Sequence, residues 1–220
     1  MSEKIQLYSL ATPNGQKVSI ALEEMGLEYT PHTINILTGD QFTEEFIKLN
    51  PNSKIPTISD PAGPDGKPIA VMESGAILLY LAEKTGQFLS TDARTRMETL
   101  QWLFFQMGGA GPMFGQFGHF YKFAAEKCDH PYPVERYKNE TRRLLKVIDT
   151  RLKGREFIAG ESYSIADMAI APWVRCLDTG YGAYEFLNVA EFNEVNRWTK
   201  SIFSRPKTIT GLDVCSLNQS

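Results

Sequence analysis

The sequence predicts a two-part protein: an α/β first part with a mixed four-strand sheet, followed by an all-helical second part. In residues 1–85, short runs of β-branched and aromatic residues alternate with segments of helical periodicity. From Thr91 onward the strand signals vanish and helical periodicity dominates. We therefore predict one domain at 1–87 and a second domain at 92–220, joined by a short link.

The first part is expected to contain four strands, whose linkers set their directions. Strand signals lie at 5–8, 29–36, 55–58 and 69–72, and helical spacing lies around 18–25, 42–49 and 74–85. A strand–helix–strand unit makes a parallel pair, whereas the short, turn-rich link at 60–66 makes an antiparallel pair. The expected sheet is therefore mixed, with helices on its faces.

The second part is expected to be built from helices alone. The clearest helical patterns lie at 94–105, 134–152, 165–177 and 192–203. The glycine- and proline-containing stretch 108–112 predicts a kink or a break after the first of them.

One local motif of this second part, Ser164-Ile165-Ala166-Asp167, matches a capping box. In this motif the Ser164 hydroxyl and the Asp167 carboxylate each accept a hydrogen bond from a free backbone N–H. Because the cap already explains this carboxylate, we interpret Asp167 as structural rather than catalytic.

Composition excludes several function classes. The net charge of −3 is the opposite of the basic face that nucleic acids need, and no run of about twenty apolar residues suggests a membrane span. The three cysteines, Cys128, Cys176 and Cys215, are widely spaced and form no C-x-x-C or Cys/His cluster. We therefore expect no disulfide framework and no metal site, and a reducing cytoplasm fits best.

Three motifs occur in order along the chain: Lys54-Ile55-Pro56, Glu73-Ser74-Gly75-Ala76-Ile77, and the segment from Gly160 to Asp167. With these motifs the sequence resembles the cytosolic glutathione transferases along nearly its whole length. Thr12 to Val18 and Leu100 to Phe104 are similar to the bacterial nu class, and fungal prion-forming nitrogen regulators share much of the pattern. The resemblance implies the glutathione transferase fold, with a thioredoxin-like first domain, and a homodimer.

Glu73 and Ser74 offer what the γ-glutamyl end of glutathione needs. Ser74 opens a helix, where free N–H groups and the helix dipole favour an anion, and Glu73 can pair with the ammonium group. The resemblance implies that both residues bind glutathione. The alternative is that Ser74 is an ordinary helix cap and Glu73 its solvated neighbour.

The resemblance implies further glutathione contacts. Pro56 is cis in the family, which turns Ile55 so that its N–H and C=O pair with the cysteinyl backbone of the ligand; a plain trans proline is the alternative. Gln41 and Lys54 are the expected contacts of the glycyl carboxylate, and Arg136 the contact from the helical domain. Lys54 and Arg136 have the alternative of being solvated surface side chains.

Thr12 and Asn14 lie between the first strand and the first helix. Thr12 suits the helix cap and Pro13 the first helical position. A free thiol has a pKa of about 8.5, so a hydroxyl and an amide donor beside the sulfur would favour the reactive thiolate. The resemblance implies that Thr12 and Asn14 are catalytic residues that contact the sulfur. Alternatively, Thr12 merely caps the helix and Tyr8 contacts the thiol.

The expected function is that of an enzyme that reduces disulfide bonds with glutathione as substrate or cosubstrate and without a metal. The first cysteine is Cys128, so the sulfurs must come from glutathione rather than from a local protein thiol. Conjugation of glutathione to small electrophiles is one alternative, and a non-catalytic glutathione-binding regulatory protein is another. The second substrate is expected near Phe114, Phe117, Phe120 and Tyr121, unless these aromatic side chains only pack together.

Overall fold

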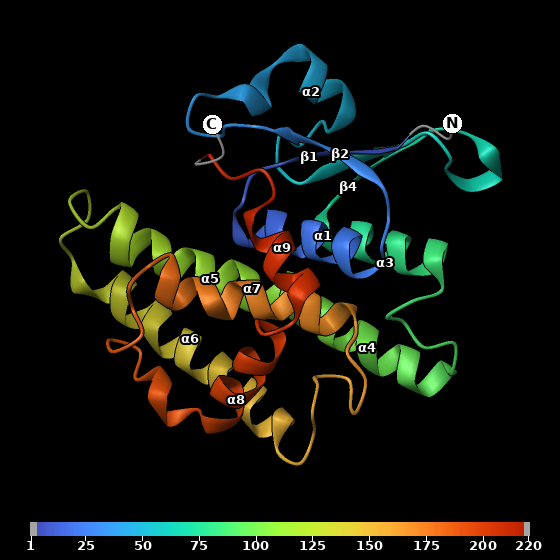
Figure 1. Cartoon of the computed structure of the whole chain (residues 1–220). Helices are drawn as coiled ribbons and strands as arrows, with labels where there is room; N and C mark the ends of the chain where they lie inside the picture. Colours follow the sequence, from blue (N-terminus) through green and yellow to red (C-terminus); the bar gives the residue numbers. More distant parts are fainter. Residues whose placement is uncertain (1–3, 218–220) are drawn as a thin grey trace. The chain divides into compact units, whose positions relative to one another are not determined.

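The computed structural model describes residues 4–217, which form two compact units (Figure 1). The first unit combines residues 4–87 with residues 204–217, and the second contains residues 88–203. This division differs from the predicted 1–87 and 92–220 in one respect, because the last segment of the chain packs with the first unit.

The first unit contains the expected mixed sheet, with the strand order β2-β1-β3-β4. β1 pairs in parallel with β2 and antiparallel with β3, and β3 pairs antiparallel with β4. The side chains of β1 alternate, so that Ile5 and Leu7 are buried while Gln6 and Tyr8 are only half-buried. One face of the sheet therefore belongs to the hydrophobic core. The strands are β1 Ile5–Ser9, β2 Tyr29–Thr33, β3 Thr57–Asp60 and β4 Ile69–Met72.

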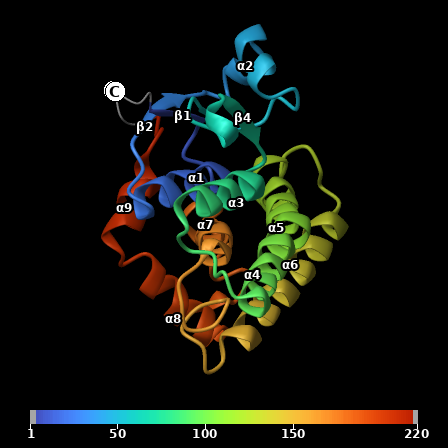
Figure 2. The same ribbon diagram turned by 90° about the vertical axis from the view of Figure 1, so that its right-hand side faces the viewer.

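Figures 1 and 2 show α1 and α3 along one face of this sheet and α2 beyond the other. The helical spacing around 42–49 produces a 3₁₀ turn followed by a short helix, because the Thr43 hydroxyl accepts a hydrogen bond from the Phe46 N–H and starts α2 there. The helices of this unit are α1 Pro13–Glu24, α2 Glu44–Leu49, α3 Ser74–Thr85 and α9 Pro206–Asp213, with 3₁₀ turns at Asp40–Phe42 and Pro64–Gly66.

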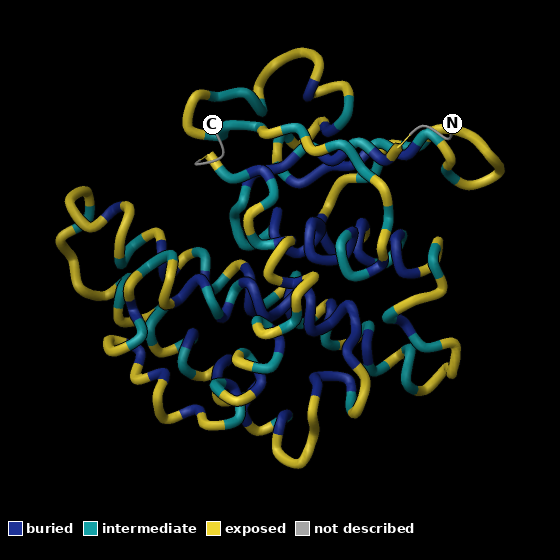
Figure 3. Tube along the Cα trace, viewed as in Figure 1, coloured by how far each residue is buried: buried dark blue, intermediate teal, exposed yellow. Residues whose placement is uncertain are grey.

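Helix α9 was not predicted, and its packing against α1 explains why the end of the chain joins the first unit. Gly211 permits the approach, since a Cβ at this position would lie 2.6 Å from the Cα of Ile20. Ser19 Oγ donates a hydrogen bond of 2.6 Å to the Gly211 carbonyl. Arg205 forms a two-pronged ion pair with Glu24, with distances of 2.8 and 2.7 Å. With α9 and α3 both packed against it, most of α1 is buried, as Figure 3 shows.

The second unit is helical, as predicted. The stretch 108–112 does not break the chain's helical path; a π-helical turn at Gln106–Ala110 leads directly into α5, and a second one follows at His119–Phe123. Such a turn accommodates one extra residue without ending the helix. Within residues 4–217, no helix has the length and apolar character needed to cross a membrane. The helices are α4 Ala93–Phe105, α5 Gly111–Gly118, α6 Pro131–Leu152, α7 Ile165–Thr179 and α8 Asn193–Ile202, with a 3₁₀ turn at Val189–Glu191.

The predicted capping box at the start of α7 is confirmed. Asp167 Oδ2 accepts a hydrogen bond of 3.0 Å from the Ser164 N–H. Its other oxygen, Oδ1, accepts one from the Ile158 N–H and one from Trp198 Nε1, each at 2.9 Å. Burial raises the pKa of this carboxyl group to about 6, and the four donors around it act in the opposite direction. Asp167 therefore joins three segments of the helical unit.

We expect Asp167→Ala to lower the free energy of unfolding by about 3 kcal/mol or more, because several buried N–H groups lose their acceptor. The matched control is Asp178→Ala on the same helix, where the side chain is exposed and the change should stay within about 0.5 kcal/mol. Urea unfolding of both variants measures the difference. Equal stabilities would contradict the structural role of Asp167.

Candidate active site

Thr12 caps α1 directly after β1, as predicted. Its hydroxyl oxygen accepts a hydrogen bond of 3.4 Å from the Gly15 N–H, and Pro13 is the first helical residue. The turn is tight: a Cβ at Gly15 would lie 1.9 Å from the Leu10 carbonyl oxygen, so this position requires glycine. Thr12 and Asn14 are half-buried, and their side chains stand at the positive end of the helix dipole.

Tyr8, the alternative thiol contact, faces away from the buried side of the sheet. Its ring stacks on His32, with ring centroids 4.7 Å apart and planes inclined by 14°. His32 also shares a hydrogen bond of 2.8 Å with Gln6 Oε1. The phenol ring therefore has a packing role on this surface, whereas Thr12 and Asn14 occupy the helix terminus.

Ile55 precedes a cis peptide bond to Pro56, as the resemblance implied. Pro56 is buried and leads into β3, which begins at Thr57. Among residues 4–217, no backbone hydrogen bond involves the N–H or the C=O of Ile55. An extended peptide lying beside Ile55 could therefore pair with both groups, as a strand added to a sheet edge does.

Glu73 and Ser74 start α3, but their positions differ from the ordinary cap considered above. Glu73 is the cap residue and has a φ of 68°, in a left-handed region that costs a non-glycine residue about 1–3 kcal/mol. Ser74 takes the first helical position and is buried. The alternative of Ser74 as a plain cap is therefore wrong. An exposed carboxylate, a hydroxyl and the free N–H groups of a helix terminus meet here.

A buried lysine lies behind Ser74, and our sequence predictions missed it. Lys17 is only 1% exposed, and its Nζ donates a hydrogen bond of 3.2 Å to Ser74 Oγ. Burial lowers the pKa of Lys17 to about 7, and the Glu73 carboxylate acts against this effect. Lys17 lies three and four residues before Ile20 and Ala21, which are both buried. A lysine on the apolar face of a helix was the signal available in the sequence.

Gln41 and Lys54, the two expected contacts of the glycyl carboxylate, have ordinary surroundings. Gln41 Nε2 donates to the Ile36 carbonyl at 3.4 Å, and within the described chain its Oε1 is buried without a partner. The side chain of Lys54 is exposed, and its carbonyl oxygen accepts a hydrogen bond of 2.7 Å from Asn50 Nδ2. The roles of Gln41 and Lys54 stay predictions.

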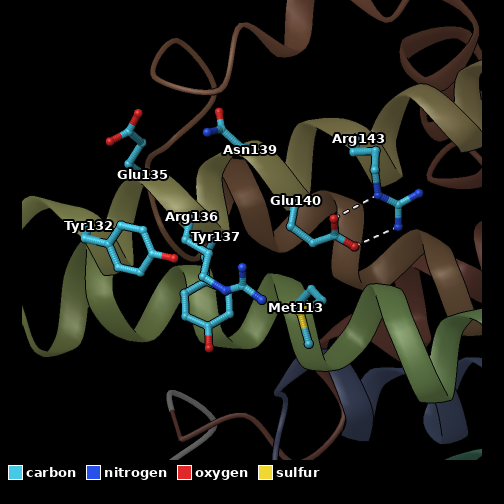
Figure 4. A pocket seen from close by; sticks show the side chains of 8 residues that line it. All are labelled: Met113, Tyr132, Glu135, Arg136, Tyr137, Asn139, Glu140 and Arg143. Atoms are coloured by element: carbon cyan, nitrogen blue, oxygen red, sulfur yellow. Dashed lines mark hydrogen bonds and ion pairs between the residues drawn. The ribbon is translucent and has the colours of Figure 1, made fainter.

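In the helical unit, Arg136 lies in a pocket of about 620 Å³ (Figure 4). The neighbouring Arg143 forms a fork with Glu140, with distances of 2.8 and 2.7 Å. No hydrogen bond or ion pair joins Arg136 to another residue of the described chain, so its donors are available to a ligand. The pocket is lined by Met113, Tyr132, Glu135, Arg136, Tyr137, Asn139, Glu140 and Arg143.

The aromatic residues expected near the second substrate mostly pack together instead. Phe114 and Phe117 are fully buried, and Phe117 stacks on Tyr121 with ring centroids 5.1 Å apart. The expectation that they line a pocket is therefore wrong for Phe114 and Phe117. Phe120 stacks on Tyr137, one of the residues that line the Arg136 pocket, at 5.6 Å.

All three cysteines are free thiols. Burial raises the pKa of the Cys176 and Cys215 thiols above the ordinary value, which makes both poorer nucleophiles. In the part of the chain that the structure describes, no three side chains of His, Cys, Asp or Glu converge as metal ligands would.

Both units of the chain contain segments that match known protein domains. Models of the glutathione S-transferase N-terminal and C-terminal domains match residues 11–84 and 112–206. The disulfide-bond oxidoreductase YghU of Escherichia coli is 47% identical over 215 residues, which cover 94% of this chain and 73% of YghU.

Two crystal structures are similar over nearly their whole length. A glutathione transferase family member from Pseudomonas fluorescens with two bound glutathione molecules has a TM-score of 0.95 and 54% identity, covering 96% of this chain and 93% of its own. A glutathione transferase from Pseudomonas putida with one bound glutathione disulfide has a TM-score of 0.93 and 53% identity. The match covers 96% of this chain and 91% of the P. putida chain. The chain therefore belongs to the glutathione S-transferase family.

Proposed function

We propose that the protein reduces disulfide bonds with glutathione as the thiol. The observation that carries this proposal is the turn at Thr12 and Asn14, where a helix terminus offers a hydroxyl and an amide side chain but the nearby sequence contains no cysteine. A site of this kind favours a thiolate that a ligand must supply. The name of the E. coli relative and the glutathione disulfide in the P. putida structure support the same chemistry.

The reaction proceeds as two thiol–disulfide exchanges. A glutathione thiolate attacks one sulfur of the substrate disulfide, and the other sulfur leaves as a thiolate that takes a proton from solvent. A second glutathione thiolate then attacks the glutathione sulfur of the mixed disulfide. The products are glutathione disulfide and the second substrate thiol, so two glutathione molecules supply the two electrons.

Different residues of the first unit would bind different parts of glutathione. Glu73 pairs with the γ-glutamyl ammonium group, while Ser74 and the first N–H groups of α3 hold the adjacent carboxylate. Ile55 pairs with the cysteinyl backbone. Gln41 and Lys54 complete the proposal as contacts of the glycyl carboxylate.

The proposal includes a homodimer in the cytoplasm. Met97 and Phe104 lie seven residues apart on one face of α4 and are 56% and 68% exposed, respectively. Large exposed apolar side chains on one helix face suit a contact with a second copy. Three free cysteines suit a reducing compartment.

We expect the purified protein to reduce a model disulfide such as bis(2-hydroxyethyl) disulfide with a higher kcat/KM than it conjugates a chlorinated aromatic electrophile. Both assays use glutathione, so the comparison depends only on the second substrate. Conjugation without disulfide reduction would favour the transferase alternative, and no turnover of either would favour a non-catalytic binding protein.

The cysteines provide the control for this experiment. Replacing Cys128, Cys176 or Cys215 by serine should leave disulfide reduction largely unchanged, because the reacting thiols belong to glutathione. A folded variant that lost its activity would make a protein thiol the nucleophile and would contradict the mechanism.

Thr12→Ala should lower kcat by roughly ten- to a hundred-fold and leave glutathione affinity nearly intact, since one hydrogen bond to a charged sulfur contributes about 1.5–3 kcal/mol. Thr12→Ser keeps the hydroxyl and the helix cap, and should restore most of the turnover. Ser74→Ala should do the reverse and mainly weaken binding. If Thr12→Ala kept full activity, Asn14 rather than Thr12 would be assigned as the contact of the thiol.

We also propose that Arg136 holds a carboxylate of a glutathione moiety in the pocket of the helical unit. Arg136→Gln should raise the KM for glutathione or a glutathione mixed disulfide roughly tenfold, corresponding to about 1.5 kcal/mol for a charged hydrogen bond. Lys146→Gln is the matched control, because this exposed lysine lies on the same helix and does not line the pocket. If the two substitutions raised the KM equally, Arg136 would not be a glutathione contact.

A further inference from the structure

The chain segment after α9 reaches the turn between β1 and α1, where Thr12 and Asn14 lie. Figures 1 and 2 show this segment running from α9 toward the sheet. The Cys215 carbonyl oxygen accepts a hydrogen bond of 3.2 Å from the N–H of Ala11, the residue directly before Thr12. A residue near the end of the sequence is therefore bonded to the middle of the turn that leads into α1.

Cys215 adopts a backbone conformation that its residue type does not favour. Val214 has a φ of −62° and a ψ of 133°, and Cys215 has a φ of 58°. The Ser216 N–H donates a hydrogen bond of 3.1 Å to the Asp213 carbonyl. These are the features of a type II turn, which favours glycine at the position of Cys215. A residue with a Cβ keeps a positive φ only where its surroundings hold it there.

The surroundings of Cys215 hold this turn against the sheet. The residue is 4% exposed, and its thiol forms hydrogen bonds with the Ser9 backbone and the Thr33 side chain. Ser9 and Thr33 are the last residues of β1 and β2. A glycine would adopt the same turn without these contacts. In either case the buried turn presents its carbonyl oxygen to Ala11 from a fixed position.

A second hydrogen bond joins the C-terminal part of the chain to the first turn of α1. Gln16 Nε2 donates a hydrogen bond of 3.1 Å to the Leu212 carbonyl, and the Gln16 N–H donates one of 2.8 Å to the Thr12 carbonyl. Gln16 is 8% exposed, so water competes little for these bonds. Leu212 and Cys215 therefore hold the chain on both sides of Thr12.

We propose that Cys215 is a positioning residue for disulfide reduction, because its carbonyl oxygen holds the Ala11 peptide group and with it the hydroxyl of Thr12. The inference rests on the proposed function, because it takes Thr12 and Asn14 as contacts of the glutathione sulfur. It assigns a part in the reaction to the backbone of a residue near the other end of the sequence.

The turn depends on such bonds because residues 10–12 belong to neither β1 nor α1. Without the Cys215 carbonyl, the N–H of half-buried Ala11 would bond to water and its peptide group could rotate. A displacement of about 1 Å in a positioning group can lower a rate by up to about a hundredfold. A displaced hydroxyl also stabilises the thiolate less, so the pKa of the bound thiol would rise toward the ordinary value of about 8.5.

Cys215→Pro tests the proposal, because proline fixes φ at about −65° and so removes the turn that places the carbonyl oxygen. Val214 already has the extended backbone that a residue before proline prefers. The kcat of disulfide reduction should fall roughly tenfold at about pH 7. The pKa of the bound glutathione thiol, measured from the ultraviolet absorbance of the thiolate, should rise toward about 8.5. Affinity for S-methylglutathione, whose sulfur cannot ionise, should stay that of the wild type.

Cys215→Gly is the matched control, because glycine keeps the turn and the carbonyl while it removes the thiol. It should match the wild type in kcat, in the pKa of the bound thiol and in affinity. The deficit of Cys215→Pro should also shrink toward about pH 9, where the thiolate forms without help from the protein. A loss of folded protein would instead lower kcat at every pH.

Gln16→Met removes the second hydrogen bond and serves as an independent variant. Ser19→Ala is its control, because it removes another hydrogen bond to α9 at a position further along α1 from Thr12. Gln16→Met should lower kcat and raise the pKa of the bound thiol, as Cys215→Pro does. Ser19→Ala should lower only the temperature of thermal unfolding.

The outcomes separate the two proposals. If Cys215→Pro keeps the wild-type kcat and thiol pKa, or if Cys215→Gly loses as much as Cys215→Pro, the role of the carbonyl is overturned and the glutathione site stands. If Cys215→Pro does not fold, Gln16→Met decides: a thiol pKa above that of Ser19→Ala supports the proposal, and an equal one overturns it. If the wild type neither lowers the thiol pKa nor reduces the disulfide, the proposed function fails together with the inference.

Discussion

The burial of helix α1 is the constraint on which the first unit depends. Every residue from Gly15 to Leu22 is buried, although three of them are polar. These buried polar side chains need hydrogen-bond partners. Ser19 and Gln16 donate hydrogen bonds to carbonyl groups of α9, and Lys17 donates one to Ser74. These bonds and the close approach of Gly15 to Leu10 fix where α1 begins.

A fixed helix start matters because the proposed glutathione site would be built largely from helix ends. The start of α1 carries Thr12, and the start of α3 carries Ser74. Glutathione would bring a thiolate and a carboxylate, two negative groups separated by a short peptide, and each would meet a helix N-terminus. In the proposed site, the backbone of Ile55 would be the third point of attachment. Elements of regular structure hold such groups more precisely than a flexible loop does.

Alternation and helical periodicity act locally, and they were sufficient to predict the sheet, α1 and α3. The family resemblance supplied the cis peptide bond before Pro56. Helix α9 was missed, since its eight residues contain a proline and a glycine and owe their position to a helix about 190 residues earlier in the chain. The role of Phe117 depended on packing partners that no periodicity identifies. Lys17 was missed because lysine is almost never fully buried, so its position on the apolar face of α1 was given no weight.

The return of α9 to α1 also determines when the first unit is completed during synthesis. A ribosome that has produced residues 4–87 has made the whole sheet but not the segment that covers one flank of α1. The intervening helical unit must be translated first, which takes on the order of ten seconds at typical elongation rates. Throughout that interval α9 cannot yet cover Ile20 and the polar side chains beside it. The first unit is therefore completed only after α9 has left the exit tunnel.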